Sequence, residues 1–243
     1  MTLILDAGNT RVKVAVFDKR ELLYSQSIAY SGFKDELNRI KDRYPSIVYA
    51  IISSVKKISE ADNHFLKNNY TLLVLNHNHK FPFINKYSTP ETLGLDRMAL
   101  VSAASYQYPG MNVLIIDAGT CITYDFINHK NEYLGGAISP GLSMRYKALH
   151  QFTANLPELS LEKPKKTIGN STISAIHSGV VNGVLLEIRG KIEIYKQNYN
   201  PLTIILTGGD AHFLLDSLKS GIFANSNFLL QGLNHILEIN LKT

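Results

Sequence analysis

The stretch LILDAGNTRVKVAVFD, residues 3–18, decides the fold of this 243-residue chain. An apolar run is interrupted at Asp6, turns at Gly8 and becomes apolar again, which predicts two adjacent strands, residues 2–8 and 11–18, joined by a tight turn. Because Gly8 has no Cβ, a polyphosphate can approach the backbone of the turn closely. An aspartate facing phosphate would repel it, so the carboxylate of Asp6 implies a bound metal ion.

The same design returns in LIIDAGTCITYDFI, residues 114–127. Asp117 occupies the place of Asp6, and a β-rich run again follows the glycine. Two copies separated by a helix-containing segment indicate a duplicated module. The sequence therefore predicts an α/β fold of two duplicated lobes with a cleft between them, each lobe a mixed sheet flanked by helices. We expect an N-terminal lobe over residues 1–110 and a C-terminal lobe over residues 111–243.

Hydrophobic periodicity places the other elements. Apolar residues spaced by three and four predict helices, and β-rich runs predict strands. A third glycine turn, LTGGDA, follows an apolar strand, where a base or ribose could rest against the backbone. The expected helices lie at 32–44, 59–69, 96–107, 142–149, 171–198 and 232–240, and further strands lie at 21–30, 46–55 and 70–76.

Composition excludes several classes of protein. The chain has 25 basic and 20 acidic residues and a single cysteine, Cys121, so neither a disulfide framework nor a cysteine-rich zinc site is possible. The basic run KPKK at 163–166 has no nucleic-acid-binding motif beside it, and we interpret it as solvated loop charge. No histidines have metal-ligand spacing, no stretch approaches a spanning helix, and no basic leader precedes an apolar run. We expect a cytoplasmic protein without nucleic-acid or membrane partners.

Several motifs resemble those of one kinase family along nearly the whole chain. The three glycine turns in this order are similar to those of the actin/Hsp70/sugar-kinase superfamily, whose lobes have a ribonuclease H-like fold. The finer pattern resembles the type III pantothenate kinase family. Its motifs are matched by DAGNTRVK (6–13), GLDR (94–97), DAGTCITYD (117–125), GGAISPG (135–141) with ALHQFTANLP (148–157), TISAIHSG (172–179) and LTGGDA (206–211).

The resemblance implies ATP-dependent phosphorylation of pantothenate, the first step of coenzyme A biosynthesis. It also implies a homodimer, magnesium with the nucleotide, and a monovalent cation, potassium or ammonium. Asp96 matches the catalytic base and Asp117 the monovalent-cation ligand. The expected nucleotide contacts are Asp6, Ala7, Gly8, Asn9, Thr10, Arg11, Val12, Lys13 and Thr120. The expected pantothenate contacts are Tyr87, Gly94, Leu95, Asp96, Arg97 and Thr172, the last near the dimer interface.

Simpler roles remain open for these residues. Asp96 and Thr172 could be helix N-caps, Asn9 and Thr10 could be turn formers, and Arg97 could be a surface residue on the first turn of its helix. Fold does not fix substrate, so another small-molecule kinase or a phosphatase is an alternative. A nucleotide-binding accessory or regulatory protein without catalysis is a third possibility.

Overall fold

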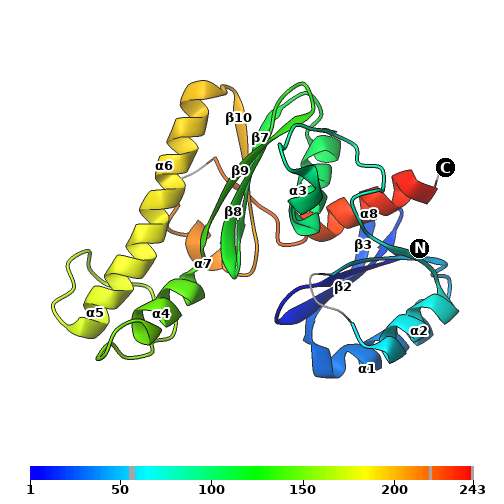
Figure 1. Cartoon of the computed structure of the whole chain (residues 1–243), viewed down its shortest axis with the longest axis horizontal. Helices are drawn as coiled ribbons and strands as arrows, with labels where there is room; N and C mark the ends of the chain where they lie inside the picture. Colours follow the sequence, from blue (N-terminus) through cyan, green and yellow to red (C-terminus); the bar gives the residue numbers. More distant parts are fainter. Residues whose placement is uncertain (55–57, 219–220, 242–243) are drawn as a thin grey trace. The chain divides into compact units, whose positions relative to one another are not determined.

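The computed structural model describes residues 1–54, 58–218 and 221–241. The chain forms two compact units, one made of Met1–Gln107 with Asn227–Thr243 and the other of Tyr108–Ser226 (Figure 1). Each unit contains a mixed β-sheet flanked by helices. The predicted α/β fold with two units built on one design is confirmed.

The sheet of the first unit has the strand order β3-β2-β1-β4-β5. Strand β1 pairs antiparallel with β2 and parallel with β4, and β2 and β3 form an antiparallel hairpin. The strands are β1 (Thr2–Ala7), β2 (Arg11–Asp18), β3 (Glu21–Ala29), β4 (Tyr49–Ser54) and β5 (Thr71–Val74). The expected strand at 46–55 thus begins later than predicted, and its last residue, Val55, lies outside the described residues.

Alternation along β1 divides its side chains between the two faces of this sheet. Leu3 and Leu5 pack into a core with α1 (Phe33–Arg43) and α2 (Glu60–Asn69). On the opposite face, the Thr2 hydroxyl donates to Asn234 Oδ1 of α8 (Phe228–Leu241) over 2.7 Å. Asp6 shares this second face with Thr2. Helix α8 also packs against α3 (Leu95–Gln107), which carries the GLDR motif at its start.

The strands that belong to the second unit repeat this plan in the order β9-β8-β7-β10-β11. Strand β7 pairs antiparallel with β8 and parallel with β10, as β1 does with β2 and β4. The strands are β7 (Asn112–Ala118), β8 (Cys121–Ile127), β9 (Glu132–Pro140), β10 (Leu202–Thr207) and β11 (Phe223–Ala224).

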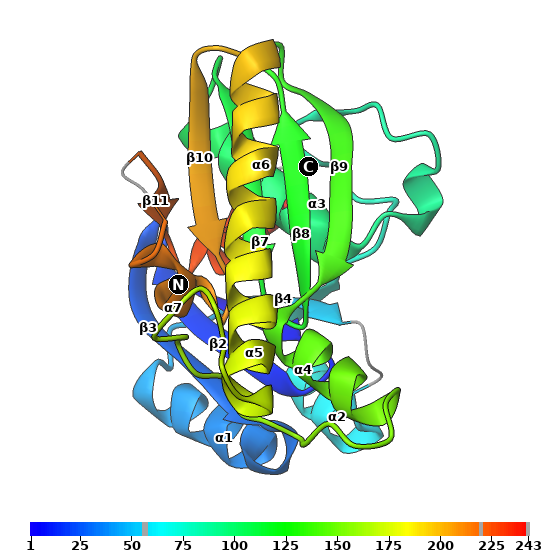
Figure 2. The ribbon, with the colours of Figure 1, turned by 90° about the vertical axis from the view of Figure 1, so that its left-hand side faces the viewer.

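Helix α6 (Gly183–Asn198) covers one face of the second sheet (Figure 2). Its buried residues Val184, Ile188 and Ile192 pack against Leu114 and Ile116 of β7. The helix expected over 171–198 is divided into α5 (Thr172–His177), a π-helical segment (Ser178–Asn182) and α6. The remaining elements are α4 (Leu142–Gln151), α7 (Ala211–Leu215), β6 (Ile84–Asn85) and the 3-10 turns Tyr30–Gly32 and Pro90–Thr92.

The C-terminal helix lies differently from the lobes expected at 1–110 and 111–243. Helix α8 belongs to the first unit, where it packs on β1, β4 and α3. Burial of its apolar residues, such as Leu233 and Ile236, against these elements explains this placement. None of the helices in the described part of the chain has the length and apolar character that crossing a bilayer requires.

Candidate active site

The first candidate phosphate turn connects β1 to β2. The Gly8 N–H donates to the Arg11 carbonyl over 3.1 Å, which closes the turn. The Tyr30 hydroxyl donates to the Gly8 carbonyl over 2.6 Å and holds the turn from the end of β3. The side chains of Asn9 and Thr10 are exposed and accessible to a ligand.

Asp6 is half-buried at the carboxyl end of β1. It stands opposite Lys13 of β2 and beside Ser53 of β4 in the strand register. Side chains at facing positions of neighbouring strands lie on the same face of a sheet. Burial, together with the charge of Asp6, raises the pKa of Tyr30 above its usual value. The Asp6 carboxylate therefore lies close enough to Tyr30, which holds the turn, to disfavour ionisation of its hydroxyl. The Asp6 carboxylate and the Lys13 side chain therefore lie on one face of the sheet beside the turn. This pair suits a phosphate group with a bound metal ion, because the carboxylate can face the metal and the lysine can face the phosphate.

The GLDR motif opens α3. The Asp96 Oδ1 accepts a hydrogen bond from the Arg97 backbone N–H over 2.8 Å. A Cβ built on Gly94 would lie 2.4 Å from that same Oδ1, so the glycine is needed for this placement of the carboxylate. The helix begins at Leu95, so Asp96 lies inside its first turn and still satisfies one of the free N–H groups there, as a cap would.

Arg97 lies beside an aromatic ring. Its guanidinium carbon is 5.7 Å from the ring centroid of Tyr87, within range of a cation–π interaction. Arg97 is 5% exposed, so the alternative of a surface residue on the helix is wrong. The first unit thus brings together Tyr87, Gly94, Asp96 and Arg97.

The second candidate phosphate turn connects β7 to β8 and is one residue shorter than the first. The Gly119 N–H donates to the Cys121 carbonyl over 3.0 Å, and the Thr120 side chain is exposed. The Gly141 N–H donates to the Thr120 carbonyl over 3.1 Å. A Cβ on Gly141 would lie 2.1 Å from the Gly119 carbonyl oxygen, so this close approach requires glycine.

Asp117 lies next to the third glycine turn, LTGGDA at 206–211. It is half-buried and lies beside Thr207 of β10 in the strand register. The backbone of Gly208, with a φ of +97°, passes so close that a Cβ would lie 2.4 Å from the Asp117 Oδ1. The Asp210 N–H donates to the Ala118 carbonyl over 2.9 Å, and burial raises the pKa of the Asp210 carboxyl. The second unit therefore unites two of the three glycine turns around Asp117.

Thr172 is the first residue of α5 and is exposed. The N-cap is Ser171, whose hydroxyl accepts from the Ser174 N–H over 3.2 Å in a capping box. The alternative that Thr172 itself caps the helix is therefore wrong. Thr172 belongs to the second unit, whereas the other expected pantothenate contacts belong to the first.

Within residues 1–54, 58–218 and 221–241, no three His, Cys, Asp or Glu side chains gather into a group that could bind a metal ion. A metal ion at this site would therefore need further ligands from a bound nucleotide or water. Magnesium that arrives with a nucleotide keeps phosphate and water oxygens as ligands and needs only one or two carboxylates. The half-buried carboxylates of Asp6 and Asp117, each beside a glycine turn, fit that requirement.

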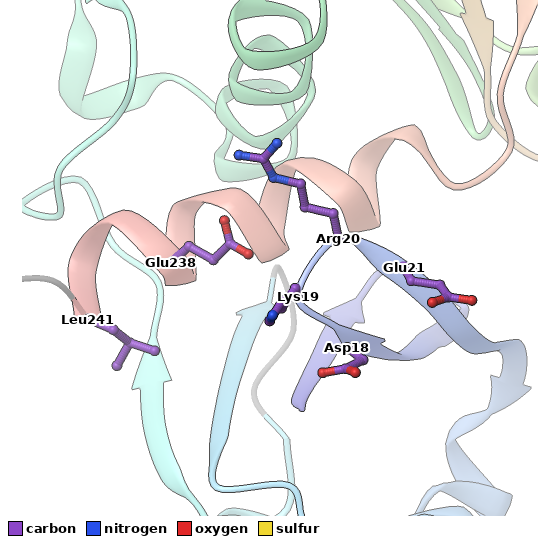
Figure 3. A pocket seen from close by; sticks show the side chains of 6 residues that line it. All are labelled: Asp18, Lys19, Arg20, Glu21, Glu238 and Leu241. Atoms are coloured by element: carbon purple, nitrogen blue, oxygen red, sulfur yellow. The ribbon is translucent and has the colours of Figure 1, made fainter.

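A separate cavity of about 700 Å³ lies at the other end of β2 (Figure 3). It is lined by Asp18, Lys19, Arg20, Glu21, Glu238 and Leu241. The Arg20 guanidinium lies 4.6 Å from the ring centroid of Tyr106. The eight residues of β2 separate this cavity from the turn at Gly8 by about 25 Å, at ~3.3 Å per residue. It is not part of the candidate active site.

Solved structures share this fold. The chain is similar to a protein from Campylobacter jejuni described as a conserved putative Baf family transcriptional activator, with a TM-score of 0.62, 23% identity and coverage of 99% of this chain and 100% of that chain. It is also similar to a glucokinase from an Antarctic psychrotroph, with a TM-score of 0.51, 14% identity and coverage of 98% of each chain. The repeated sheets with their aspartate–glycine turns place the chain in the same fold class as this glucokinase.

Sequence relatives narrow this class to one family. The family model for type III pantothenate kinase matches residues 2–193. Proteins named type III pantothenate kinase from Christiangramia forsetii and Flavobacterium johnsoniae are 51% and 46% identical, and each alignment covers 99% of both chains. The chain belongs to the type III pantothenate kinase family.

Two residues that the sequence does not predict as site residues contact a glycine turn or the segment next to one. They are Tyr30 and Arg145. Tyr30 lies 22 residues from its hydrogen-bond partner Gly8. Arg145 donates hydrogen bonds to the Ser139–Gly141 segment, which approaches the second turn. The position of Tyr30 at the end of a strand that pairs beside the turn is the only sequence signal for such a role.

Proposed function

We propose that this protein phosphorylates pantothenate with ATP to give 4′-phosphopantothenate, the first step of coenzyme A biosynthesis. One observation carries the proposal. In a chain of this family, the Asp96 carboxylate lies close to Gly94 and accepts from the backbone of Arg97, a buried arginine whose guanidinium is within cation–π range of Tyr87. This arrangement combines an acceptor for a hydroxyl proton with a cation for a carboxylate, and pantothenate has both groups.

Asp96 acts as the catalytic base in this proposal. The primary hydroxyl oxygen of pantothenate forms a bond to the γ-phosphorus, ADP leaves, and the hydroxyl proton passes to an Asp96 carboxylate oxygen. The Arg97 N–H holds Oδ1 and so fixes the carboxylate's direction. Positioning contributes more than basicity, because a loose transition state keeps the hydroxyl proton until late.

Arg97 and Tyr87 bind the acceptor's carboxylate end. A guanidinium pairs with carboxylate through two parallel hydrogen bonds, and the contact with the Tyr87 ring helps to hold the guanidinium in place. Gly94 and Leu95 supply backbone contacts, and Thr172, whose side chain is exposed, is the remaining proposed pantothenate contact.

The two aspartate–glycine turns bind the nucleotide. In the first, the residues Asp6, Ala7, Gly8, Asn9, Thr10, Arg11, Val12 and Lys13 contact ATP, and in the second Thr120 does so. Asp6 would face the magnesium ion bound with ATP, and that ion would supply charge neutralisation on the phosphates. Asp117 would hold the monovalent cation, potassium or ammonium, because one half-buried carboxylate next to a close-packed glycine turn suits a singly charged ion with oxygen ligands.

A homodimer formed through α5 and α6 is part of the proposal. Ile173, Leu186 and Ile194 are 52%, 65% and 56% exposed, although apolar side chains of this size are mostly buried in folded proteins. Leu186, Gly190 and Ile194 are spaced by four and share one side of α6. Ile173 directly follows Thr172, so a second copy that covered Ile173 would also lie next to Thr172. Location in the cytoplasm stays a prediction from the sequence.

The experiment is a kinase assay with purified protein, ATP and pantothenate, with and without potassium. We expect 4′-phosphopantothenate, faster with potassium, and a loss of at least about 100-fold in kcat for Asp96→Asn. Asp42→Asn, an exposed carboxylate on α1, is the matched control and should not change kcat. Absence of product with or without potassium would sink the proposal in favour of a noncatalytic nucleotide-binding protein. An active Asp96→Asn variant would favour a different base and a different natural substrate.

A further inference from the structure

The Ser139–Gly141 segment at the end of β9 has no role in the catalytic steps above, yet it contacts the second phosphate turn. We propose that Arg145 is a positioning residue that holds this segment against the turn, and that Glu187 holds Arg145 in place. The inference rests on the proposed binding of ATP at Thr120.

The guanidinium of Arg145 reaches the segment twice. From α4, its Nε donates to the Pro140 carbonyl over 2.9 Å, and a terminal nitrogen donates to the Ser139 hydroxyl oxygen over 2.9 Å. These two bonds use the fixed fork of an arginine, which a lysine ammonium cannot reproduce. Arg145 therefore fixes both the backbone and a side chain of the segment.

Glu187 of α6 completes the arrangement. It forms an ion pair with Arg145 and accepts hydrogen bonds from Tyr124 over 2.9 Å and Ser139 over 3.0 Å. Burial acts to raise the pKa of Glu187, but the hydrogen bonds from Arg145, Tyr124 and Ser139 outweigh it and lower the pKa below its usual value. The side chains of Arg145 and Glu187 are each only 24% exposed, so water competes weakly with this pair.

The segment transmits this constraint to the nucleotide turn. Directly after Pro140, the Gly141 N–H donates to the Thr120 carbonyl, and the backbone approach is too close for any Cβ. Movement of the segment must therefore move Thr120. A chain of direct contacts leads from Glu187 through Arg145 and Pro140 to the residue proposed to contact ATP.

The test measures the dissociation constant of a non-hydrolysable ATP analogue with magnesium, together with kcat, KM and thermal unfolding. Arg145→Lys keeps the positive charge beside Glu187 but loses the fork, and Arg145→Gln loses both. We expect each to weaken nucleotide binding about tenfold, the effect of one charge-assisted hydrogen bond. The KM for pantothenate should change by less than about twofold, because Thr120 is a proposed contact of the nucleotide and not of pantothenate.

Arg189→Gln is the matched control. Arg189 on α6 donates to the Ser217 carbonyl in the same unit but does not touch the Ser139–Gly141 segment. Its replacement should lower the melting temperature without changing nucleotide affinity. Equal weakening of nucleotide binding by Arg189→Gln and Arg145→Gln would mean general loosening of the unit and would overturn the proposal, as would wild-type affinity in a folded Arg145→Lys variant.

The two proposals fail in different ways. Wild-type protein that binds the ATP analogue but does not phosphorylate pantothenate contradicts the proposed substrate alone, and the Arg145 variants still test positioning through the dissociation constant. Wild-type protein that binds no nucleotide overturns both proposals. If Arg145→Gln does not fold, Arg145→Lys decides the outcome.

Discussion

Replacement of Gly208 by alanine tests how the third glycine turn is fitted over β7. Gly208 has a φ of +97°, a region that costs an L-residue about 1–2 kcal/mol. The added Cβ would lie 2.3 Å from the Ala118 carbonyl oxygen and 2.4 Å from the Asp117 Oδ1. The Asp117 side chain can rotate, but the Ala118 backbone belongs to the central strand of the sheet and cannot yield alone. Overpacking of this kind costs about 1–3 kcal/mol, so we expect a total loss of about 2–5 kcal/mol in the free energy of unfolding.

The assay is thermal unfolding followed by circular dichroism. With an unfolding entropy of about 2.1 cal/mol/K per residue, a loss of 3 kcal/mol lowers the Tm of the whole chain by about 6 °C. Gly209→Ala is the matched control, because a Cβ there meets no atom within 4 Å. Its Tm should stay within about 2 °C of wild type, since alanine at a compatible position is neutral or slightly stabilising. Equal melting temperatures for the two variants would refute the close approach described above.

Three further predictions concern the two units separately. Gly94→Ala should lower kcat by at least about 100-fold, because the new Cβ displaces the Asp96 carboxylate. Its Tm should change little. Steady-state kinetics measure the first effect and thermal unfolding measures the second. Tyr30→Phe should raise the KM for ATP by about three- to tenfold, since it removes the hydroxyl that donates to the Gly8 carbonyl, and an unchanged KM would contradict this role. The folded-state pKa of Glu187 lies below its ordinary value of 4.5, so its charge stabilises the fold above that pH and this contribution is lost on acidification. The Tm of wild type should therefore fall more steeply than that of Glu187→Gln below about pH 4.5, and parallel curves would contradict it.

The fold was predictable because its signals are local. Apolar runs broken by Asp-Ala-Gly at Asp6 and at Asp117 predict strand, turn and strand, and their repetition predicts two units of one design. The hydrogen bonds at Gly8 and Gly119 and the matching strand orders confirm that prediction. Helix α8 shows the limit of such reasoning, because nothing in its own amphipathic pattern indicates which sheet it covers.

The candidate site was predictable only in part. The resemblance to a kinase family supplies Asp96, Arg97 and Tyr87 as candidates. In the structure the Asp96 carboxylate accepts from the Arg97 backbone, and the Arg97 guanidinium lies beside the Tyr87 ring. Their catalytic and binding roles stay predictions. Tyr30 and Arg145 could not be predicted, since a hydrogen bond to a distant backbone carbonyl leaves no periodic or compositional signal in the sequence.

The sequence by itself determined the family, the two α/β units and the positions of the three glycine turns, because strand alternation and turn chemistry depend on neighbouring residues. Only the tertiary structure decided which partners hold those turns: Tyr30 on Gly8, Gly141 on Thr120, and Gly208 on Asp117. These contacts join residues 21 to 91 positions apart, and packing of whole strands and helices sets them. The physical reason is that close approach of two backbones depends on where each element is anchored, which no single stretch of sequence specifies.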